Sequence, residues 1–270
     1  MPGAVVGSIW VLRHGERADV ADPTWLETAD RPHDPPLTAL GQQQAQATAN
    51  ALANERIDAI YSSPFLRCMQ TAAAVARVRG LPIRVEPGLG ELLNERWFPN
   101  GHPVDVSMSD DWLAEAVGEQ LIDREYASIY DTPARRGAEV GYELELTFPE
   151  PPLEAAARYA NTLDVLRHRA ADRFFADRSE GAESSPSSGP FALLVTHGFG
   201  VQALAESIDG VEVLECDYCA LTRLVRHQTE VPQQQSQWEE EETAMASDEW
   251  RCEVLCRATH TVGVGTATTV

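Results

Sequence analysis

Short apolar runs alternate with segments of helical spacing along most of this chain. Strands are predicted at about residues 7–13, 57–61, 83–85, 191–195, 219–226 and 250–257. Helices are predicted between them, at about residues 38–54, 63–79, 153–174 and 201–208. Such alternation is typical of an α/β protein in which helices cover both faces of a mostly parallel sheet. The pattern therefore predicts a three-layer sandwich.

Local signals mark the ends of two of these helices. Thr38 is a predicted N-cap. Ser63 followed by Pro64 predicts another helix start, because serine is favoured as the cap and proline at the first helical position. We expect that helix to stop at Gly80.

Three stretches depart from the alternation. Residues 92–150 mix Pro, Gly, Trp and acidic residues without a clean period, and we interpret them as an insertion, or cap, over a site. Residues 179–190 form a polar linker. Residues 228–249 contain a run of Gln and Glu that predicts a solvated loop, with an interaction motif as the alternative. We expect one domain over residues 1–270.

The charge of the chain limits its partners. A formal net charge of -21 argues against nucleic acid and anionic membranes as partners. The sequence shows neither an apolar stretch long enough for a transmembrane helix nor a signal-peptide pattern. Five cysteines, an odd number, suit a reducing compartment, so we expect a cytoplasmic protein. An anionic substrate would need a local positive pocket on this negative body.

Two histidines follow predicted buried strands at opposite ends of the chain. Arg13-His14-Gly15-Glu16-Arg17 comes after the first strand, and Thr196-His197-Gly198 after the strand at 191–195. In an open parallel sheet, residues just past the carboxyl ends of the strands line the ligand crevice. Two histidines there, one flanked by arginines, indicate capture and transfer of a phosphoryl group.

The residue types match that chemistry. His14 can act as a nucleophile, because an ordinary imidazole pKa of about 6.5 leaves much of it neutral near pH 7. Arg13 and Arg17 offer guanidinium groups, which bind phosphate oxygens in a bidentate way. Arg67 lies in the first turn of a predicted helix, whose N-terminus also favours anions.

Three further residues complete the expected site. Gly15 would let the backbone approach the phosphate without a Cβ in the way. His197 would donate a hydrogen bond to a phosphoryl oxygen as charge builds there. We interpret Glu16 as a buried partner that orients the site, not as a participant in the reaction.

These motifs resemble the histidine phosphatase superfamily, also called the phosphoglycerate mutase-like superfamily. The resemblance spans about residues 8–226 and rests on Arg13-His14-Gly15-Glu16, Pro36-Leu37-Thr38, Ser62-Ser63-Pro64-Phe65-Leu66-Arg67, Gln70-Thr71-Ala72, Glu86-Pro87-Gly88-Leu89-Gly90-Glu91 and Thr196-His197-Gly198. Within the superfamily, the chain is most similar to the phosphatase domain of the suppressors of T-cell receptor signalling. The resemblance implies a phosphoglycerate mutase-like fold.

The resemblance also implies a role for each site residue. His14 would be the phosphorylated nucleophile, and a carboxylic acid that protonates the leaving group aligns on Glu91. The phosphate would be bound by Arg13, Arg17, Arg67 and His197, with Gly15 and Gly198 beside them. We expect neither a metal nor a cofactor.

The proton donor has a competitor. Leu92 stands where the resembled branch tends to have tryptophan, and Glu95 lies one helical turn after Glu91. A leaving-group acid should lie in a partly desolvated place that raises its pKa, and we expect such a place at Glu91.

Other chemistry-bearing residues are expected to be structural. The remaining histidines lack a strand-end glycine: His33, His102, His168, His227 and His260. The spacing of Cys216, Cys219, Cys252 and Cys256 superficially suggests zinc, but buried free cysteine is common in apolar strand-like segments. A cysteine phosphatase is not indicated, because no cysteine is followed by arginine six positions later. Trp97, Phe98 and Trp112 form either an apolar wall for a leaving group or, as we favour, the core of the cap.

Three functions remain open. The leading hypothesis is a metal-independent phosphomonoester hydrolase that works through phosphohistidine, on a phosphotyrosine protein or on a small phosphate ester. A phosphoglycerate mutase is a second, although mutases of this superfamily usually carry serine where Arg17 stands. A catalytically weak phospholigand-binding module is a third, although it would not need a nucleophile. The sequence predicts no oligomeric state.

Overall fold

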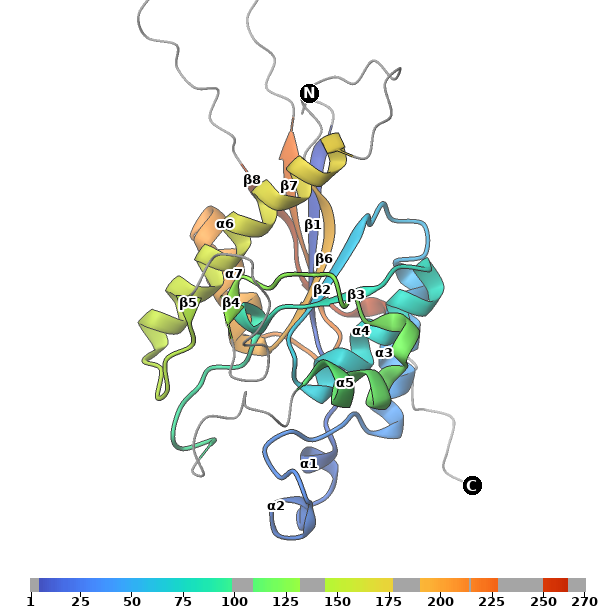
Figure 1. The fold of residues 1–270 in the computed structure, drawn as a ribbon, viewed down its shortest axis with the longest axis vertical. Helices are drawn as coiled ribbons and strands as arrows, with labels where there is room; N and C mark the ends of the chain where they lie inside the picture. Colours follow the sequence, from blue (N-terminus) through green and yellow to red (C-terminus); the bar gives the residue numbers. More distant parts are fainter. Residues whose placement is uncertain are drawn as a thin grey trace, which may run out of the picture.

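A mixed sheet forms the centre of the molecule (Figure 1). The computed structural model describes residues 5–98, 109–131, 144–176, 190–213, 215–227 and 250–261. In these residues, six strands lie in the order β3 (Ile83–Val85), β2 (Ala59–Ser62), β6 (Phe191–Thr196), β1 (Val5–Arg13), β7 (Leu221–His227) and β8 (Trp250–Arg257). The first four are parallel, β7 runs antiparallel to β1, and β8 antiparallel to β7. The predicted, mostly parallel sheet is confirmed.

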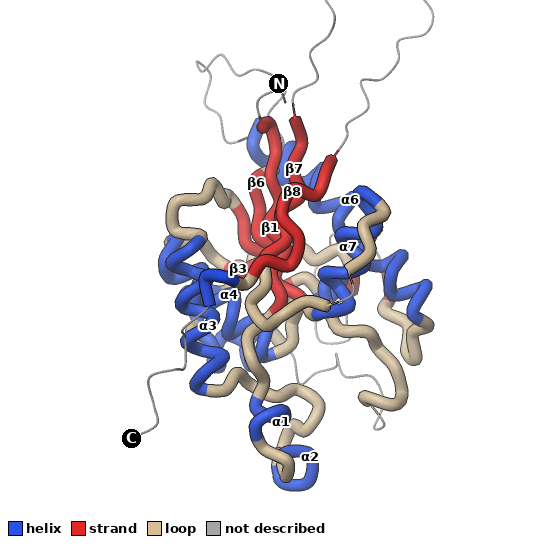
Figure 2. Tube along the Cα trace, turned by 180° about the vertical axis from the view of Figure 1, so that it is seen from behind, coloured by secondary structure: helices blue, strands red, loops and turns tan. Residues whose placement is uncertain are grey.

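Helices cover both faces of this sheet. One side carries α3 (Ala39–Ala51), α4 (Leu66–Arg79) and α5 (Asp110–Val117), and the other carries α6 (Pro152–Ala176) and α7 (Gly198–Asp209) (Figure 2). Alternate strand residues explain this, because successive side chains point to opposite faces of a sheet. Trp10 and Leu12 pack in the α3–α4 core, and Ile9 and Val11 pack in the α6 core. The predicted three-layer sandwich is confirmed.

The ends of α3 and α4 test the predicted capping signals. Thr38 caps α3, and its Oγ1 accepts a hydrogen bond from the Gly41 amide at 2.9 Å. The predicted start of α4 was wrong. This helix begins at Leu66, and its first amide donates to Asp34 Oδ1 at 2.8 Å, because the loop before α3 brings that carboxylate to the helix end. Gly80, with φ of +66°, ends α4 as expected.

The described segments of residues 92–150, the region predicted as a cap, pack on different elements of the fold. α5 and η3 (Glu119–Leu121) pack on α4. β4 (Tyr130–Asp131) pairs with β5 (Leu144–Glu145), and Tyr130 joins the α6 core. Leu93 and Phe98 pack on Phe65, which precedes α4. Residues 99–108 and 132–143 lie outside the described part, so the cap as a unit stays a prediction.

Three further short helices lie before α3 and after β8. α1 (Ala18–Ala21) and α2 (Trp25–Thr28) lie in the loop after β1, and η4 (Thr259–Thr261) follows β8 and packs on α3. Most of the predicted linker, residues 177–189, and the whole acidic loop, residues 228–249, lie outside the described part. Among the described residues, none of the helices combines the length and hydrophobicity needed to cross a membrane.

Candidate active site

Neighbouring parallel strands bring the two predicted histidines together. β1 pairs with β6 up to Arg13 and Thr196, so His14 and His197 follow at the same level of the sheet. Their ring centroids are 5.4 Å apart, and both side chains are buried. Ser63, just after β2, reaches the same place, and its Oγ lies 2.9 Å from His197 Nε2. The carboxyl edge of the sheet thus forms one site, as the sequence predicted.

The bonding of His14 leaves one ring nitrogen available. Nδ1 lies 2.8 Å from the carbonyl oxygen of Gly15. A carbonyl oxygen can only accept, so Nδ1 of the neutral ring carries the proton and Nε2 carries the lone pair. Burial lowers the pKa of His14 well below its ordinary value, and the charges of Arg67 and His197 lower it further. The ring is therefore neutral at pH 7.

Arg67 is a buried cation held at the start of α4. Its Nη2 lies 3.1 Å from His197 Nδ1 and 3.4 Å from Glu91 Oε2, and its guanidinium lies over the ring of Phe65. The carboxylate of Asp34 is 3.9 Å from Nη1. Even so, Nε and Nη1 have no hydrogen-bond partner among the described residues. Buried donors without partners are costly, and an anion bound beside them would satisfy them.

Arg13 lies on the opposite side of His14, in contact with the loop before β7. Its Nη1 donates to the carbonyl oxygen of Cys216, and its guanidinium lies 4.4 Å from the ring centroid of Tyr218. That ring is in turn 5.8 Å from the His14 ring. Gly198 leaves room here, since a Cβ would lie 3.6 Å from Arg13 Nε. Tyr218 could not be predicted as part of the site, because nothing in its spacing along the chain relates it to β1.

Arg17 differs from the other predicted phosphate ligands. Its guanidinium forms a salt bridge with Asp19 at 2.7 Å, and its side chain is 30% exposed. Its positive charge still acts on His197, whose pKa it helps to lower. The structure therefore places Arg17 at the rim of the site, paired with Asp19.

Packing gives a reason for glycine at position 15 besides the predicted approach to the phosphate. The Gly15 amide donates to Thr71 Oγ1 at 3.1 Å, so it is already occupied. A Cβ on Gly15 would lie 2.7 Å from the carbonyl oxygen of Gly41 in α3. Glycine is needed because the backbone of α3 packs on this turn, and that packing fixes the position of His14.

Glu91 is buried against the site, as predicted, but its electrostatics differ from the prediction. Oε2 lies 3.2 Å from His197 Nδ1. Burial alone would raise the pKa of Glu91, yet the charges and hydrogen bonds of His197 and Arg67 outweigh it and hold this pKa below its ordinary value. Burial lowers the pKa of His197 to about 4, so at pH 7 the remaining positive neighbour of Glu91 is Arg67. The expected raised pKa was wrong for the unliganded site, in which Glu91 is a carboxylate.

Residues of α6 hold the segment that carries Glu91, and no motif in the sequence indicated them. Arg158 donates to the carbonyl oxygens of Gly88, Gly90 and Glu91 at 2.7, 3.1 and 3.2 Å. Glu150 neutralises Arg158 at 2.7 Å, and both side chains are buried. The hydroxyl of Tyr159 donates to the carbonyl oxygen of Gly90. A helical pattern identified α6 correctly but did not indicate that one of its arginines turns inward.

The competing and structural residues lie elsewhere. Glu95 is exposed, whereas Glu91 contacts the site. Glu16 is half-buried and accepts a hydrogen bond from Thr38 Oγ1 at 2.8 Å, which ties the histidine loop to α3. Histidines with contacts outside the site are His33 on Phe98, His168 on Asp164, His227 on Glu253 and His260 on Thr48. His102 lies outside the described residues.

The three aromatic residues of the expected cap divide between core and surface. Phe98 packs on Phe65, in agreement with a core role. Trp112 is half-buried against the α3–α4 core, and the Arg31 guanidinium stacks on it at 3.8 Å. Trp97 is 47% exposed.

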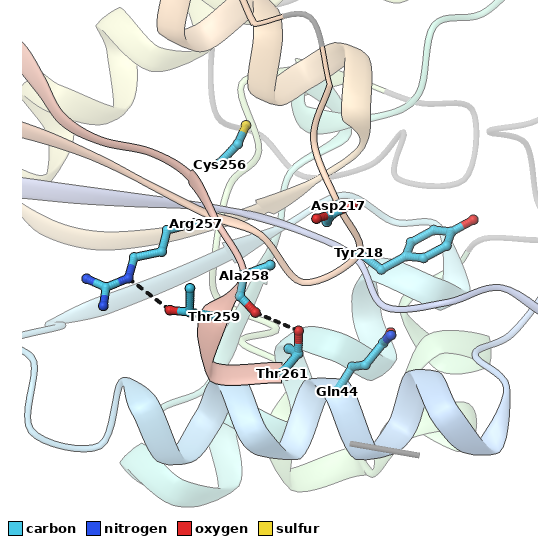
Figure 3. Close-up of a pocket in the computed structure, with 8 residues that line it drawn as sticks. All are labelled: Gln44, Asp217, Tyr218, Cys256, Arg257, Ala258, Thr259 and Thr261. Carbon is cyan, nitrogen blue, oxygen red and sulfur yellow. Dashed lines mark hydrogen bonds between the residues drawn. The ribbon is translucent and has the colours of Figure 1, made fainter. Parts of the chain in front are cut away.

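The cysteines are free thiols. In the part of the chain that the structure describes, no three His, Cys, Asp or Glu side chains gather as a metal site would require. Beside Tyr218, a pocket of about 480 Å³ opens between α3, the loop before β7 and the end of β8 (Figure 3). Its lining residues are Gln44, Asp217, Tyr218, Cys256, Arg257, Ala258, Thr259 and Thr261.

Comparison with known proteins agrees with this geometry. Residues 9–113 match the family described as histidine phosphatase superfamily (branch 1). Human ubiquitin-associated and SH3 domain-containing protein A, a suppressor of T-cell receptor signalling, is 27% identical over 252 residues, which cover 81% of this chain. The chain spans only 33% of the length of that relative.

Solved structures show the same fold. The ecdysone phosphate phosphatase of the silkworm Bombyx mori, crystallised with tungstate, has a TM-score of 0.55 at 20% identity, covering 86% of this chain and 97% of its own. A phosphoglycerate mutase from Bacillus anthracis has a TM-score of 0.55 at 15% identity, covering 96% of each chain. Fold and site thus define a phosphoglycerate mutase-like α/β protein. The part of the chain that matches the family model, residues 9–113, is similar to the histidine phosphatase superfamily.

Proposed function

We propose that this protein is a metal-independent phosphomonoester hydrolase that works through a phosphohistidine on His14. The observation that carries the proposal is a neutral, buried imidazole with an available Nε2 between two arginines that keep unpartnered donors. Its substrate would be a phosphotyrosine protein or a small phosphate ester. Arginine side chains supply the positive charge that a phosphate dianion requires.

The first half of the reaction moves the phosphoryl group to the enzyme. Arg13 and Arg67 bind the phosphoryl oxygens, and Nε2 of His14 attacks phosphorus. The P–N bond forms as the P–O ester bond breaks. The bound dianion offsets the charge of Arg67 and repels the Glu91 carboxylate, which raises the pKa of Glu91 and lets it bind a proton. Glu91 gives that proton to the leaving oxygen.

The second half returns the enzyme to its starting state. Glu91, now a carboxylate, takes a proton from water, and the water oxygen attacks phosphorus. The new P–O bond forms as the P–N bond breaks, so inorganic phosphate leaves, His14 is neutral again and Glu91 releases its proton to solvent. Hydrogen bonds from Arg67 and His197 stabilise the charge on the phosphoryl oxygens in both halves.

The test is hydrolysis of p-nitrophenyl phosphate in EDTA by the wild type, His14→Ala and His168→Ala. His168 is an exposed histidine on α6 and serves as the matched control. We expect turnover in the wild type and in His168→Ala, and none in His14→Ala. Rapid quenching should give an acid-labile, base-stable phosphorylated peptide containing His14. Activity that EDTA abolishes, or that survives in His14→Ala, would overturn the proposal.

Assays on the same protein distinguish the hydrolase from a phosphoglycerate mutase and from a binding module. A mutase would interconvert phosphoglycerates without net release of phosphate, and a binding module would bind vanadate without turnover. The Arg17–Asp19 pair favours the hydrolase, because mutases of this superfamily usually have serine at the position of Arg17. A substrate screen would then compare a phosphotyrosine peptide, a steroid phosphate and 3-phosphoglycerate.

The setting of this activity follows from composition. We propose that it is cytoplasmic, where a reducing medium keeps the five cysteines as thiols. The net charge of -21 disfavours nucleic acid and anionic membranes as partners, which leaves the phosphorylated substrate as the expected partner.

A further inference from the structure

Two cysteines outside the reaction lie together beside Arg13. Cys216 is in the loop before β7, and Cys256 is near the end of β8, where it lines the pocket shown in Figure 3. Their thiols form a side-chain hydrogen bond. Cys256 has a φ of +45°, a backbone conformation that is uncommon for a non-glycine residue. The fold thus brings together two thiols from segments 40 residues apart.

The environment makes these thiols unequal. The hydrogen bond from Cys216, supported by Thr222 and the charge of Arg13, lowers the pKa of the Cys256 thiol, although burial and Asp217 oppose this. The same hydrogen bond raises the pKa of Cys216. A thiolate is the reactive form of cysteine, and Cys256 lines the pocket, so we assign Cys256 as the nucleophile and Cys216 as the neighbouring thiol.

The other cysteines differ in surroundings. Burial raises the pKa of Cys68, beside His197, to about 12, and that of Cys219 to about 12. Both are buried thiols and therefore unreactive. Cys252, on β8 with Cys256, is half-buried, and its Sγ lies 3.5 Å from the carbonyl oxygen of Val254. It serves as a natural comparison for Cys256.

We propose that Cys216 and Cys256 are a redox pair, which hydrogen peroxide converts into a disulfide that lowers the activity of the adjacent site. The Cys256 thiolate attacks one peroxide oxygen, the O–O bond breaks, and hydroxide leaves and takes up a proton to become water. The resulting sulfenic acid is attacked by the sulfur of Cys216. The S–S bond forms, the S–O bond breaks, and the hydroxyl leaves as water with the Cys216 proton. Two thiols lose two electrons, and peroxide becomes two waters.

The link to the active site is short. The carbonyl of Cys216 accepts the hydrogen bond of Arg13, and Tyr218, two residues on, contacts both Arg13 and His14. A disulfide requires the sulfur atoms to come within about 2.05 Å of each other, closer than two hydrogen-bonded thiols. Its formation must draw the Cys216 loop toward β8 and displace the groups that hold Arg13. The effect on activity, unlike the disulfide, rests on the proposed function.

The test treats the full chain with hydrogen peroxide, blocks remaining thiols with N-ethylmaleimide and maps peptides by mass spectrometry. Cys252→Ser is the background, because Cys252 and Cys256 fall in one tryptic peptide, and fragment ions distinguish Cys216 from Cys219, which also share one. We expect a Cys216–Cys256 crosslink, a fall in kcat/KM of about 10- to 100-fold, as for a misplaced binding group, and recovery with dithiothreitol. Cys256→Ser should keep its own untreated activity after peroxide.

Other outcomes would count against the redox pair. Absence of the crosslink at saturating peroxide overturns it, as does an equal loss of activity in Cys256→Ser. Circular dichroism checks the folding of each variant, and Cys256→Ala replaces a serine variant that does not fold. If the untreated chain shows no phosphatase activity, the crosslink and its reversal still decide the disulfide by mass alone. Failure of the proposed phosphatase function can then be distinguished from failure of the redox-pair proposal.

Discussion

His14 and His197 occupy equivalent positions after two strands, yet their neighbours give them different chemistry. His197 has contacts at both ring nitrogens, with Ser63 Oγ at 2.9 Å and Arg67 Nη2 at 3.1 Å. For His14, only Nδ1 is hydrogen-bonded among the described residues. A nucleophile needs an unshared lone pair, so the bonding agrees with the proposed roles of His14 as the nucleophile and of His197 as a phosphate-binding residue.

Two glycines of the site should respond differently to a methyl group. Gly15→Ala would place a Cβ 2.7 Å from the backbone of α3, so His14 must shift. We expect kcat/KM to fall about tenfold or more, since small misplacements of a reacting group are costly. Gly198→Ala would add only an ordinary contact at 3.6 Å and should lose less. Steady-state kinetics of both variants check this, and a larger loss in Gly198→Ala would contradict it.

Between elements, α6 acts as a brace for the segment that carries Glu91. Arg158 reaches across from α6 to the backbone carbonyl groups of Gly88, Gly90 and Glu91 in that segment, and Glu150 neutralises its charge. η1 (Pro87–Leu89) and Glu91, the proposed proton donor, are therefore placed by a helix on one face of the sheet, whereas Arg67 comes from a helix on the other. The site is assembled across the whole sandwich.

Removing the brace should affect both stability and catalysis. Arg158→Ala leaves the buried carboxylate of Glu150 without its partner, which typically costs about 3–5 kcal/mol of unfolding free energy. Urea unfolding measures this loss, and kcat should fall in the folded variant because Glu91 is no longer fixed. Arg167→Ala is the control on the same helix, since Arg167 pairs with the exposed Asp164. Comparable losses in the two variants would refute the brace.

Elements of this fold could largely be predicted from sequence because their signals are local. β8, at residues 250–257, agrees with the predicted strand to the residue, and Gly80 ends α4 as expected. The start of α4 could not be predicted, because Asp34, which accepts from its first amide, comes from a distant loop. The same holds within the site, where strand ends identified His14 and His197, while Tyr218 and Arg158 act through tertiary contacts.

At the scale of the whole molecule, a strongly acidic chain carries a cationic site. The net charge is -21, yet Arg67 and two histidines are buried together at the carboxyl edge of the sheet. Burying imidazole groups beside guanidinium groups keeps them neutral, and this ties the stability of the fold to pH.

Acid should therefore destabilise the protein through His197. Its pKa is about 4 in the fold against an ordinary 6.5, so below pH 6.5 the unfolded chain binds more protons than the folded one. Stability falls as pH drops from 6.5 toward 4, by about 2 kcal/mol between pH 7 and pH 5. Urea unfolding at the two pH values measures the loss. His197→Asn should show a smaller pH dependence; an equal one would contradict the assignment.

The unpartnered donors of Arg13 and Arg67 have a consequence for regulation by metabolite levels. Donors that lack partners in the resting state are satisfied by any phosphate ion, including the one that the proposed reaction releases. The resting enzyme would thus be partly occupied by its own product, and cellular inorganic phosphate would set the fraction that is open to substrate. Feedback inhibition would then follow from the catalytic arginines themselves, without a separate regulatory domain.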